Sequence, residues 1–499
     1  MVTLLEKTAE LNLIEKEKRT TNILEKYLLT NMPIEKWITV EEKGNENPEI
    51  TKRIYTVLPM ELANFIRNNL NYFFVRADAM EKPLIYVYMD GVYKNVSDEE
   101  FKGFIKSFIP YQLRKTKEIN EIFCDLTTDL KFVSYEKLDA DENIINFEDG
   151  ILNIDTMELM PHSPNIYSTI QIPAKYKEIE NCEEPATVFE AYMMNLVDGS
   201  VDAYMMLMEI IGLIMSNIPC SRTKKSLMLC GAGDTGKSQL KRLVEELIGQ
   251  NNVSTIDLKN LNERFGTANL YKKRLAGSND MSFQRITDMS IYKQVTGGDK
   301  ITVEFKHKGS FPYEYKGFLW FNCNKLPLFG GDDGKWVYDR MLIIYCKNVI
   351  PNEKKDPEIF NKMWKERNMI IKQALYFLNQ LRGNKFKFTI PAEMAELRTQ
   401  YEIENNTLLS FIEECCDKVT LLPTNRLRKT DFKKLYYRWV DYNNGGKGKL
   451  KNKEIEEILK NRYGFNIKKY DGYDLIEGLI IKKDAYSELG LASWESNIW

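Results

Sequence analysis

The stretch that decides the fold occupies residues 226–238 and reads Ser-Leu-Met-Leu-Cys-Gly-Ala-Gly-Asp-Thr-Gly-Lys-Ser. Gly231, Gly236, Lys237 and Ser238 fit the phosphate-loop spacing, with an apolar strand before the loop and a helix expected over 239–247. The glycines let backbone N–H groups close around phosphate oxygens, and the helix N-terminus adds the positive end of its dipole. The pattern therefore predicts a nucleotide site. The alternative is a glycine-rich turn ahead of an ordinary helix.

Two side chains of this loop have specific expected roles. Lys237 would reach the β- and γ-phosphates, and the Ser238 hydroxyl would take one position on Mg²⁺. A phosphate loop alone indicates only a nucleotide, since kinases, GTPases and motors share it. The expected nucleotide-binding residues are Gly231, Ala232, Gly233, Asp234, Thr235, Gly236, Lys237, Ser238 and Gln239.

The composition describes an ordinary globular protein. Of the 499 residues, 43% are hydrophobic and 28% charged, which excludes wholesale disorder. The 70 Lys and Arg nearly balance the 72 Asp and Glu, so the net charge of −2 gives no overall sign of a nucleic-acid partner. Eight scattered cysteines favour a reducing, cytoplasmic setting, and two histidines make a structural zinc site improbable. The most apolar stretch, 203–218, carries Glu209 and is too short for a membrane span, so we expect a buried helix and a soluble protein with no membrane partner.

Short apolar strands alternate with helical segments between residues 226 and 345, which is typical of an α/β domain. Residues 273–280 predict a second strand that ends at Asp280, an acid that would polarise the attacking water or hold the metal. This strand is weak because Gly277 and Ser278 replace bulky residues, and a solvated loop acid is the alternative. Residues 317–327 predict a buried strand followed by Asn324, which could sense a γ-phosphate and orient water. Arg340 directly precedes another apolar strand, 341–345.

This set of motifs resembles the superfamily 3 helicases of phage and plasmid replication, which are related to the poxvirus-type primase-helicases. The similarity extends to replication initiators of mobile genetic islands. It covers roughly residues 140–485, includes the stretch 143–155 as part of a small domain before the motor, and leaves the first 110 residues or so uncovered. The motifs stand in the family's order, and they are the 231–238 loop, Asp280, residues 293–299, Asn324 with Lys325 and Pro327, and Arg340.

The resemblance implies an AAA+-like motor that assembles as a ring, typically a hexamer, with ATP and Mg²⁺ at subunit interfaces. Asn324 matches the sensor asparagine, and Asp280 matches the acidic position, with Asn279 where a second acid would stand. Arg340 would be an arginine finger that reaches a neighbour's γ-phosphate, and the alternative is an edge salt bridge with Asp339. The expected catalytic residues are Lys237, Asp280, Asn324 and Arg340, and the expected metal ligands are Ser238 and Asp280.

Lys224 and Lys225 precede the strand that leads into the loop. They could contact a nucleotide bound to a neighbouring subunit. A solvated strand edge explains them equally well.

Residues 301–305 and 311–315 alternate in polarity and predict a β-hairpin, whose tip carries Lys306, His307 and Lys308. In the resembled family such a hairpin projects into the ring channel and grips the DNA backbone. Cations and an imidazole donor suit phosphate. The alternative is a loop that lysines keep soluble.

The C-terminal part is basic, since residues 421–470 hold 14 Lys and Arg but 5 Asp and Glu. An amphipathic helix over 430–442, a second helix over 453–463 with Asn452 as N-cap, and a hairpin that turns at 471–472 predict a winged-helix domain. The second helix would enter a major groove of duplex DNA. We expect Tyr436, Tyr437 and Trp439 to be core residues rather than base-stacking ones. The expected DNA contacts here are Lys449, Lys451, Lys453, Lys468 and Lys469.

These patterns predict an N-terminal α+β accessory region at 1–110, beginning with a helical stretch over 1–43. A small domain at 111–200, the motor at 201–350, a helical connector at 351–405 and a winged helix at 406–499 follow. The predicted function is an ATP-dependent DNA helicase and replication initiator. One alternative is an initiator whose ATPase only controls assembly. Another adds primase activity, because Asp139 and Asp141 have the spacing of a two-metal site, although little chain precedes them. The hairpin and Arg340 disfavour a small-molecule kinase.

Overall fold

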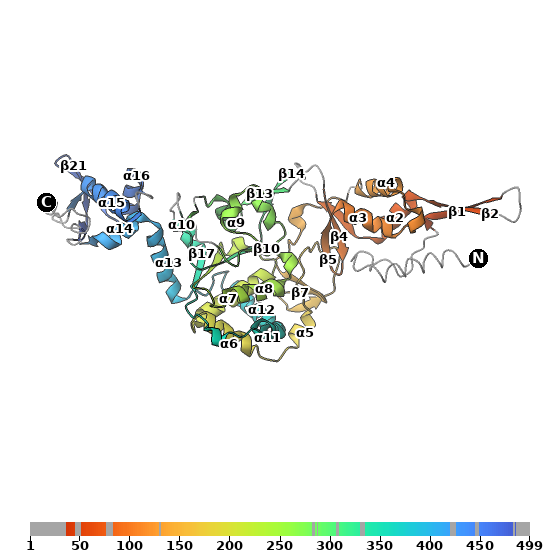
Figure 1. The fold of residues 1–499 in the computed structure, drawn as a ribbon, viewed down its shortest axis with the longest axis horizontal. Helices are drawn as coiled ribbons and strands as arrows, with labels where there is room; N and C mark the ends of the chain where they lie inside the picture. The colour runs from red at the N-terminus through yellow and green to blue at the C-terminus, as the bar shows by residue number, and fades with distance from the viewer. Residues whose placement is uncertain are drawn as a thin grey trace.

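A five-stranded parallel sheet forms the centre of the protein, in the order β10-β11-β15-β9-β17 (Figure 1). The computed structural model describes residues 36–44, 51–75, 83–128, 131–281, 285–286, 288–305, 309–329, 335–419, 426–444, 449–482 and 485. The sheet strands are β9 (Ser226–Cys230), β10 (Val253–Thr255), β11 (Leu275–Gly277), β15 (Phe318–Cys323) and β17 (Met341–Tyr345). The predicted α/β class is confirmed, and the weak strand before Asp280 is present as β11.

Both faces of the sheet are covered, which explains why its strands are continuous apolar runs rather than alternating ones. Every residue of β9 and of β15 is buried. Helices α7 (Val201–Met215), α8 (Lys237–Ile248) and α12 (Arg367–Gly383) pack on one face. The other face packs against α9 (Ser290–Gly297) and the hairpin of β13 (Lys300–Phe305) and β14 (Gly309–Glu314). The remaining short elements here are β12 (Arg285–Ile286), β16 (Leu328–Phe329) and α10 (Lys335–Asp339).

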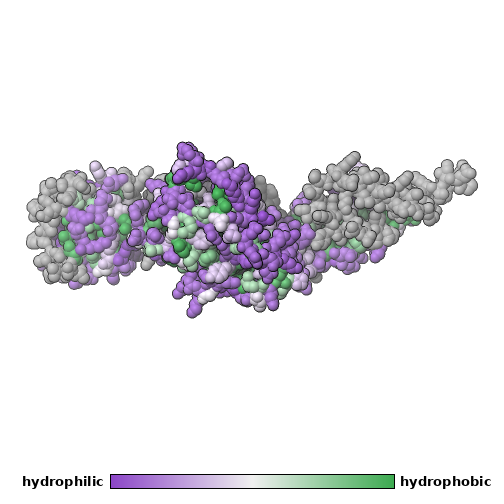
Figure 2. All heavy atoms as spheres, turned by 90° about the horizontal axis from the view of Figure 1, so that it is seen from below, coloured by the Kyte–Doolittle hydropathy of each residue, from purple (hydrophilic) through white to green (hydrophobic). Residues whose placement is uncertain are grey.

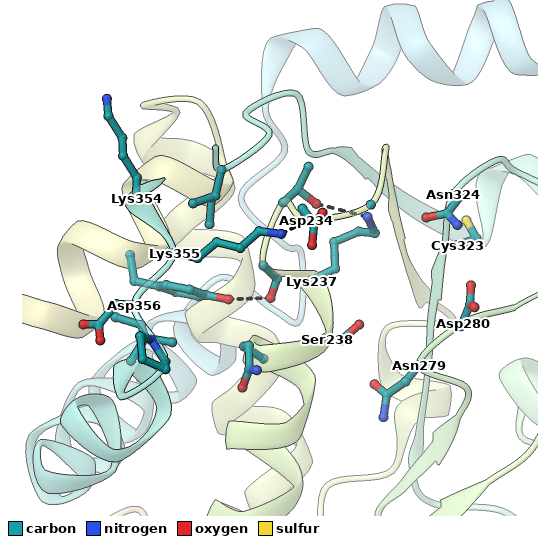
Figure 3. Close-up of a pocket in the computed structure, with 18 residues that line it drawn as sticks. Asp234, Lys237, Ser238, Asn279, Asp280, Cys323, Asn324, Lys354, Lys355 and Asp356 are labelled. Carbon is teal, nitrogen blue, oxygen red and sulfur yellow. Dashed lines mark hydrogen bonds and ion pairs between the residues drawn. The ribbon is translucent and has the colours of Figure 1, made fainter. Parts of the chain in front are cut away.

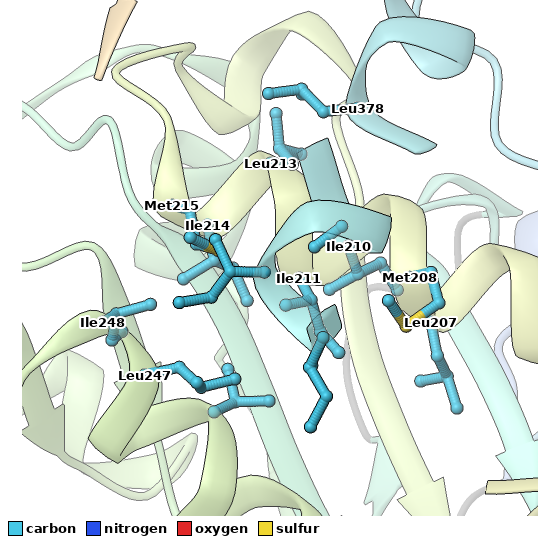
Figure 4. Packing of buried hydrophobic residues seen from close by; sticks show 14 of the residues in the cluster. Leu207, Met208, Ile210, Ile211, Leu213, Ile214, Met215, Leu247, Ile248 and Leu378 are labelled. Carbon is cyan, nitrogen blue, oxygen red and sulfur yellow. The ribbon is translucent and has the colours of Figure 1, made fainter. Parts of the chain in front are cut away.

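Helix α7 is the buried helix expected at 203–218, and it lies between α8 and α12 (Figure 4). Gly212 permits its close approach to α12, because a Cβ atom at this position would stand 2.3 Å from the Ala374 carbonyl oxygen. Within the described ranges, no helix combines the length and apolarity that a membrane crossing requires. The outer surface seen in Figure 2 is mostly hydrophilic, with hydrophobic residues in small patches.

A small antiparallel sheet and two helices precede α7 in the chain. The strands are β6 (Ile144–Phe147), β7 (Gly150–Asn153) and β8 (Glu158–Met160), and the helices are α5 (Tyr176–Glu180) and α6 (Thr187–Leu196). Helices α11 (Ile359–Lys365) and α12 form the first part of the helical connector expected at 351–405. Glu366 stands between these two helices, where its carboxylate accepts hydrogen bonds from the N–H groups of Val188 (3.0 Å) and Phe189 (2.8 Å) at the start of α6.

The N-terminal lobe has its own core and lies at one end of the elongated molecule (Figure 1). Its elements are β1 (Ile38–Gly44), β2 (Thr51–Val57), α2 (Pro59–Asn69), β3 (Tyr72–Val75), β4 (Leu84–Met89), β5 (Val92–Val96), α3 (Asp98–Ser107) and α4 (Thr116–Thr127). The helix expected over 1–43 is wrong for its last part, since β1 pairs with β2 along its whole length. The β-branched run Ile38-Thr39-Val40 favours a strand, and cross-strand pairing stabilises it. Residues 1–35 lie outside the described residues.

The C-terminal lobe lies at the opposite end, beyond α13 (Ala392–Asn405) (Figure 1). It contains α14 (Thr407–Cys415), β18 (Cys416–Lys418), β19 (Arg426–Arg428), α15 (Lys429–Asn444), α16 (Asn452–Asn461), β20 (Asn466–Tyr470), β21 (Tyr473–Glu477) and β22 (Leu479–Ile481). Both predicted helices and the hairpin are therefore present, although the N-cap of α16 is Lys451 rather than Asn452. Tyr436 and Trp439 are buried in the core of this lobe, as expected.

Candidate functional site

The glycine loop at 231–236 joins the carboxyl end of β9 to the amino end of α8. Its backbone turns sharply, with left-handed φ values of 61° at Asp234 and 98° at Gly236, the N-cap of α8. A Cβ atom on Gly231 would lie 2.2 Å from the Cys346 carbonyl oxygen, so a side chain does not fit there. The first N–H groups of α8 have no partner within the helix, and they point with the positive dipole end toward the loop. The loop is thus built to bind an anion.

Lys237, the first residue of α8, closes this loop from inside. Its ammonium group donates to the carbonyl oxygens of Gly231 (2.8 Å) and Ala232 (2.7 Å) and to Thr235 Oγ1 (3.0 Å). The side chain is buried. A cation held at the centre of a ring of backbone groups can pair with a phosphate group that enters the loop.

A pocket of about 720 Å³ opens beside the loop, and five segments of the chain form its three walls. Residues 233–239 form the first wall. Asn279 and Asp280, which follow β11, form the second wall together with Cys323 and Asn324 at the end of β15. Figure 3 shows Asp280 and Asn324 across the pocket from the loop residue Ser238. The pocket thus brings together Lys237, Ser238, Asp280 and Asn324.

The order of the strands explains this convergence. After β9 and α8 the chain passes to β10 at the far edge and returns through β11 and β15, so that β15 lies directly beside β9. In parallel sheets, ligands bind beyond the carboxyl ends of the strands where the strand order reverses. The Asp280 and Asn324 side chains follow two such strand ends, and both residues are exposed. Oxygen atoms of a hydroxyl and a carboxylate are ligands that Mg²⁺ prefers.

Three thiols pack below the loop. Cys230 and Cys323 are paired in register on the adjacent strands β9 and β15. A hydrogen bond with Cys323 lowers the pKa of the Cys230 thiol, and the same bond raises the pKa of Cys323. Burial raises the pKa of Cys346 to about 12. These groups form an apolar floor under the loop.

The third wall of the pocket was missed by sequence reasoning. It consists of Tyr192 on α6 and of residues that follow β17, namely Ile350, Lys354, Lys355, Asp356, Pro357 and Ile359. The Tyr192 hydroxyl donates to the Gly236 carbonyl oxygen, and burial raises the Tyr192 pKa. Lys355 pairs with Asp234 of the loop at 3.0 Å (Figure 3). The adjacent lysines Lys354 and Lys355, in the segment between β17 and α11, were the one signal that could have indicated this wall.

Arg340 does not line the pocket, because it lies at the amino end of the parallel strands, whereas the pocket lies at their carboxyl end. It directly precedes β17, which runs parallel to β9 and starts beside Ser226. A five-residue strand spans about 16 Å, so Arg340 and the loop are separated by the length of the sheet. Its guanidinium donates to Thr296 Oγ1 (2.8 Å) and to the Lys293 carbonyl oxygen (3.2 Å) in the last turn of α9. The 293–299 motif therefore positions Arg340.

The same amino edge of the sheet carries Lys224 and Lys225. Lys224 is exposed, whereas Lys225 donates to the Asp339 carbonyl oxygen beside Arg340. Burial lowers the pKa of Lys225. Asp339 itself forms an ion pair with Arg398 at 3.2 Å.

The candidate DNA contacts lie apart from the pocket. Lys306, His307 and Lys308 fall outside the described residues, and the pairing of β13 with β14 on either side of them in the sequence is as expected. In the C-terminal lobe, Lys451 is exposed. Three of the other four expected lysines form ion pairs: Lys449 with Asp441 (2.6 Å), Lys453 with Glu457 (4.0 Å) and Lys468 with Glu477 (2.9 Å). Lys469 is exposed and lies opposite Asp474 in the sheet register.

The Asp139-x-Asp141 spacing serves the structure. The Asp139 carboxylate accepts hydrogen bonds from the Thr169 N–H and hydroxyl groups, and it pairs with the buried Lys272 ammonium at 3.0 Å. Asp141 accepts a hydrogen bond from the Asn143 N–H at 2.9 Å. The two carboxylates therefore bind different parts of the chain.

The fold and the pocket together define an α/β protein with a glycine-loop anion site at the carboxyl edge of a parallel sheet. Two family models match parts of the chain. Residues 50–194 match the model described as "D5 N terminal like", and residues 229–340 match a family of unknown function, DUF5906. The D5 match begins well before residue 140, where the sequence resemblance was placed, and includes most of the N-terminal lobe. The second match spans the loop, Asp280, Asn324 and Arg340.

Solved structures of the NrS-1 C-terminal region are similar to this chain. An A-form apo structure of that region has 14% sequence identity and a TM-score of 0.45, with 84% of this chain and 100% of that chain covered. An apo structure of its residues 305–718 has 14% identity and a TM-score of 0.44, with 85% and 99% covered. No curated protein matches the sequence.

Proposed function

We propose that this chain is an ATP-dependent DNA helicase and replication initiator of the D5-type primase-helicase class, acting as a ring on DNA. The observation that carries the proposal is the pocket in which Lys237, Ser238, Asp280 and Asn324 meet. The four residues come from three separate segments of the chain. The family resemblance implies a place for all four in one site. The D5 match over residues 50–194 supports the class.

The residues of the pocket suit Mg²⁺ and ATP. Lys237 and the loop N–H groups bind the phosphates, and the Ser238 hydroxyl with the Asp280 carboxylate can hold Mg²⁺, whose charge polarises the γ-phosphate when bound. Asp280 also stands where it can accept a proton from the attacking water, and the Asn324 amide can orient that water. The apolar side chains of Ile350, Pro357 and Ile359 offer a surface for the base.

Arg340 fits a role between subunits. It lies at the edge of the sheet opposite its own pocket, so it can serve only a pocket of another copy. Packing copies with the amino edge of one sheet against the pocket of the next would bring Arg340, with Lys224, to the phosphates. This arrangement gives a ring or a helical filament rather than a two-fold dimer.

Strand displacement from a forked DNA duplex, measured with ATP and Mg²⁺, tests the proposal. We expect the wild-type chain to assemble and to displace the strand, and we expect Lys237→Ala to assemble without displacing it. Replacement of Lys306, His307 and Lys308 by Ala should leave ATP turnover but abolish displacement. Assembled rings that turn over ATP and displace no strand would contradict the helicase and favour the alternative, an initiator whose ATPase controls assembly. A chain that stays monomeric with ATP and forked DNA would contradict the role of Arg340.

A further inference from the structure

In the C-terminal lobe, one face of the three-stranded sheet β19-β21-β20 packs on the core of the lobe. The other face does not pack on this core. Leu427, Ile476 and Ile467 are mutual register partners across the three strands, and they face the core below α14, α15 and α16. Because successive side chains alternate between faces, their neighbours along each strand point outward. The outward residues are Arg426, Arg428, Asn466, Lys468, Tyr470, Tyr473, Leu475 and Glu477.

Arginines and tyrosines are stacked on this outer face. The Arg426 guanidinium lies 3.7 Å from the ring centroid of Tyr470, and the Arg428 guanidinium lies 4.2 Å from that of Tyr473. The two tyrosines are register partners beside the turn at 471–472. Tyr473 is 50% exposed, a large fraction for an aromatic side chain. The face therefore presents planar cationic and aromatic groups to solvent.

The charge of the face is positive. Three cations, Arg426, Arg428 and Lys468, share it with one carboxylate, that of Glu477. Glu477 is nearly buried and is held by Lys468 (2.9 Å), by Arg426 (3.7 Å) and by the Tyr470 hydroxyl (3.0 Å). The Arg426 Nε atom is buried without a hydrogen-bond partner. Glu477 thus fixes two of the cations in place and does not cancel the charge of the face.

The helix expected to enter a major groove has the opposite character. Within Asn452–Asn461, α16 has two lysines and three glutamates. Glu454 and Glu457 are exposed, and Lys453 is paired with Glu457. Phosphates on both sides of a major groove would repel this helix.

We propose that the outer face of β19-β21-β20 binds single-stranded DNA, with bases stacked on Tyr473 and on the arginine planes, and with Arg428 and Lys468 near phosphates. Proteins that bind single strands combine cations along the backbone with exposed aromatic rings for the bases. Planar guanidinium groups also stack on bases. DNA binding by this face requires no ATP hydrolysis, so it can be tested independently of the proposed ATPase.

Fluorescence anisotropy with a labelled single-stranded oligonucleotide, without ATP, tests the proposal on the full chain. The starting protein carries Ala at Lys306, His307 and Lys308, so that the expected hairpin grip does not contribute. We expect Tyr473→Ala to weaken binding about tenfold and Tyr473→Phe to retain it, because stacking needs the ring and not the hydroxyl. Arg428→Ala should weaken binding and reduce the slope of log affinity against log salt by about 0.7.

The matched control is Lys460→Ala, at an exposed lysine in the last turn of α16. We expect this variant to change single-strand affinity less than twofold. Equal loss of affinity in Tyr473→Phe and Tyr473→Ala would overturn the stacking role. The full chain could instead bind a duplex more tightly than the single strand. If this duplex binding were lost in the α16 control and retained in Tyr473→Ala, the proposal would be overturned in favour of DNA binding by α16.

Discussion

At the scale of single residues, the pocket separates binding from catalysis. We expect Lys237 and the loop to contact the phosphates both before and after hydrolysis, because the Lys237 ammonium already lies within the loop. Asp280 stands on the opposite wall, and among the described residues it forms no hydrogen bond with the loop. A carboxylate in that position contributes to the chemical step more than to affinity.

Asp280→Asn should therefore slow ATP turnover by about 10²- to 10³-fold while nucleotide affinity changes little. Steady-state turnover and titration with a fluorescent ATP analogue measure the two quantities. Asp356→Asn is the matched control, since Asp356 lines the same pocket but pairs with Lys362 at 2.6 Å. We expect the control to reduce turnover less than about threefold. Equal losses in the two variants would contradict the assignment of Asp280.

At the scale of elements, the small domain and the motor are joined by a buried ion pair. Asp139 precedes β6, Lys272 precedes β11, and both side chains are largely buried. Burial by itself raises the pKa of Asp139, but Lys272 and the hydrogen bonds from Thr169 outweigh it, and the pKa is lowered. The folded state therefore binds this proton less readily than the unfolded chain does.

A lowered carboxyl pKa contributes stability that is present above the unfolded pKa of about 4 and is lost as the pH falls through the folded value. Asp139→Asn leaves Lys272 buried without its partner, so we expect a loss of about 3 kcal/mol at pH 7. The difference from the wild type should shrink as the pH falls below about 4, because the Asp139 carboxyl of the unfolded chain gains its proton there while the folded one is still ionised. Urea unfolding at pH 7 and near pH 3 measures it. A difference that does not depend on pH would contradict the role of the charge.

The elements that sequence could predict are those with strong local patterns. β9, β15 and β17 are unbroken apolar runs beside recognisable loops, and their order along the chain sufficed to place Lys237, Asp280 and Asn324. The third wall could not be predicted, since Tyr192 comes from a helix far away in sequence and Ile350 from a loop without a motif. β1 was missed because its stability comes from pairing with β2, and this pairing outweighed a mixed-charge pattern that favours helix.

At the scale of the whole molecule, the central domain with the parallel sheet lies between two lobes, each with a core of its own (Figure 1). The near-neutral net charge hides a basic C-terminal segment, as its sequence indicates. Within this segment, the outer face of β19-β21-β20 carries three cations and one carboxylate, whereas α16 carries two lysines and three glutamates. The proposed role of Arg340 likewise requires an assembly of several copies.

Mixing two inactive variants tests the role of Arg340 across subunits. Arg340→Ala keeps its own Lys237, and Lys237→Ala keeps its own Arg340, so a mixed assembly contains some complete sites. We expect each variant alone to be inactive and an equal mixture to recover ATP turnover, up to about a quarter of the wild-type rate if subunits mix at random. No recovery in mixtures shown to co-assemble would contradict a finger supplied by a neighbour.

The most direct test of the central claim is the rate of ATP hydrolysis by the full chain with Mg²⁺, compared with that of Lys237→Ala. Circular dichroism and the thermal midpoint should first establish that the variant is folded. We expect the wild type to hydrolyse ATP and the rate in Lys237→Ala to be at least about 10²-fold lower, because the loop loses the cation that pairs with the phosphates. A folded Lys237→Ala variant that hydrolyses ATP at the wild-type rate would contradict it.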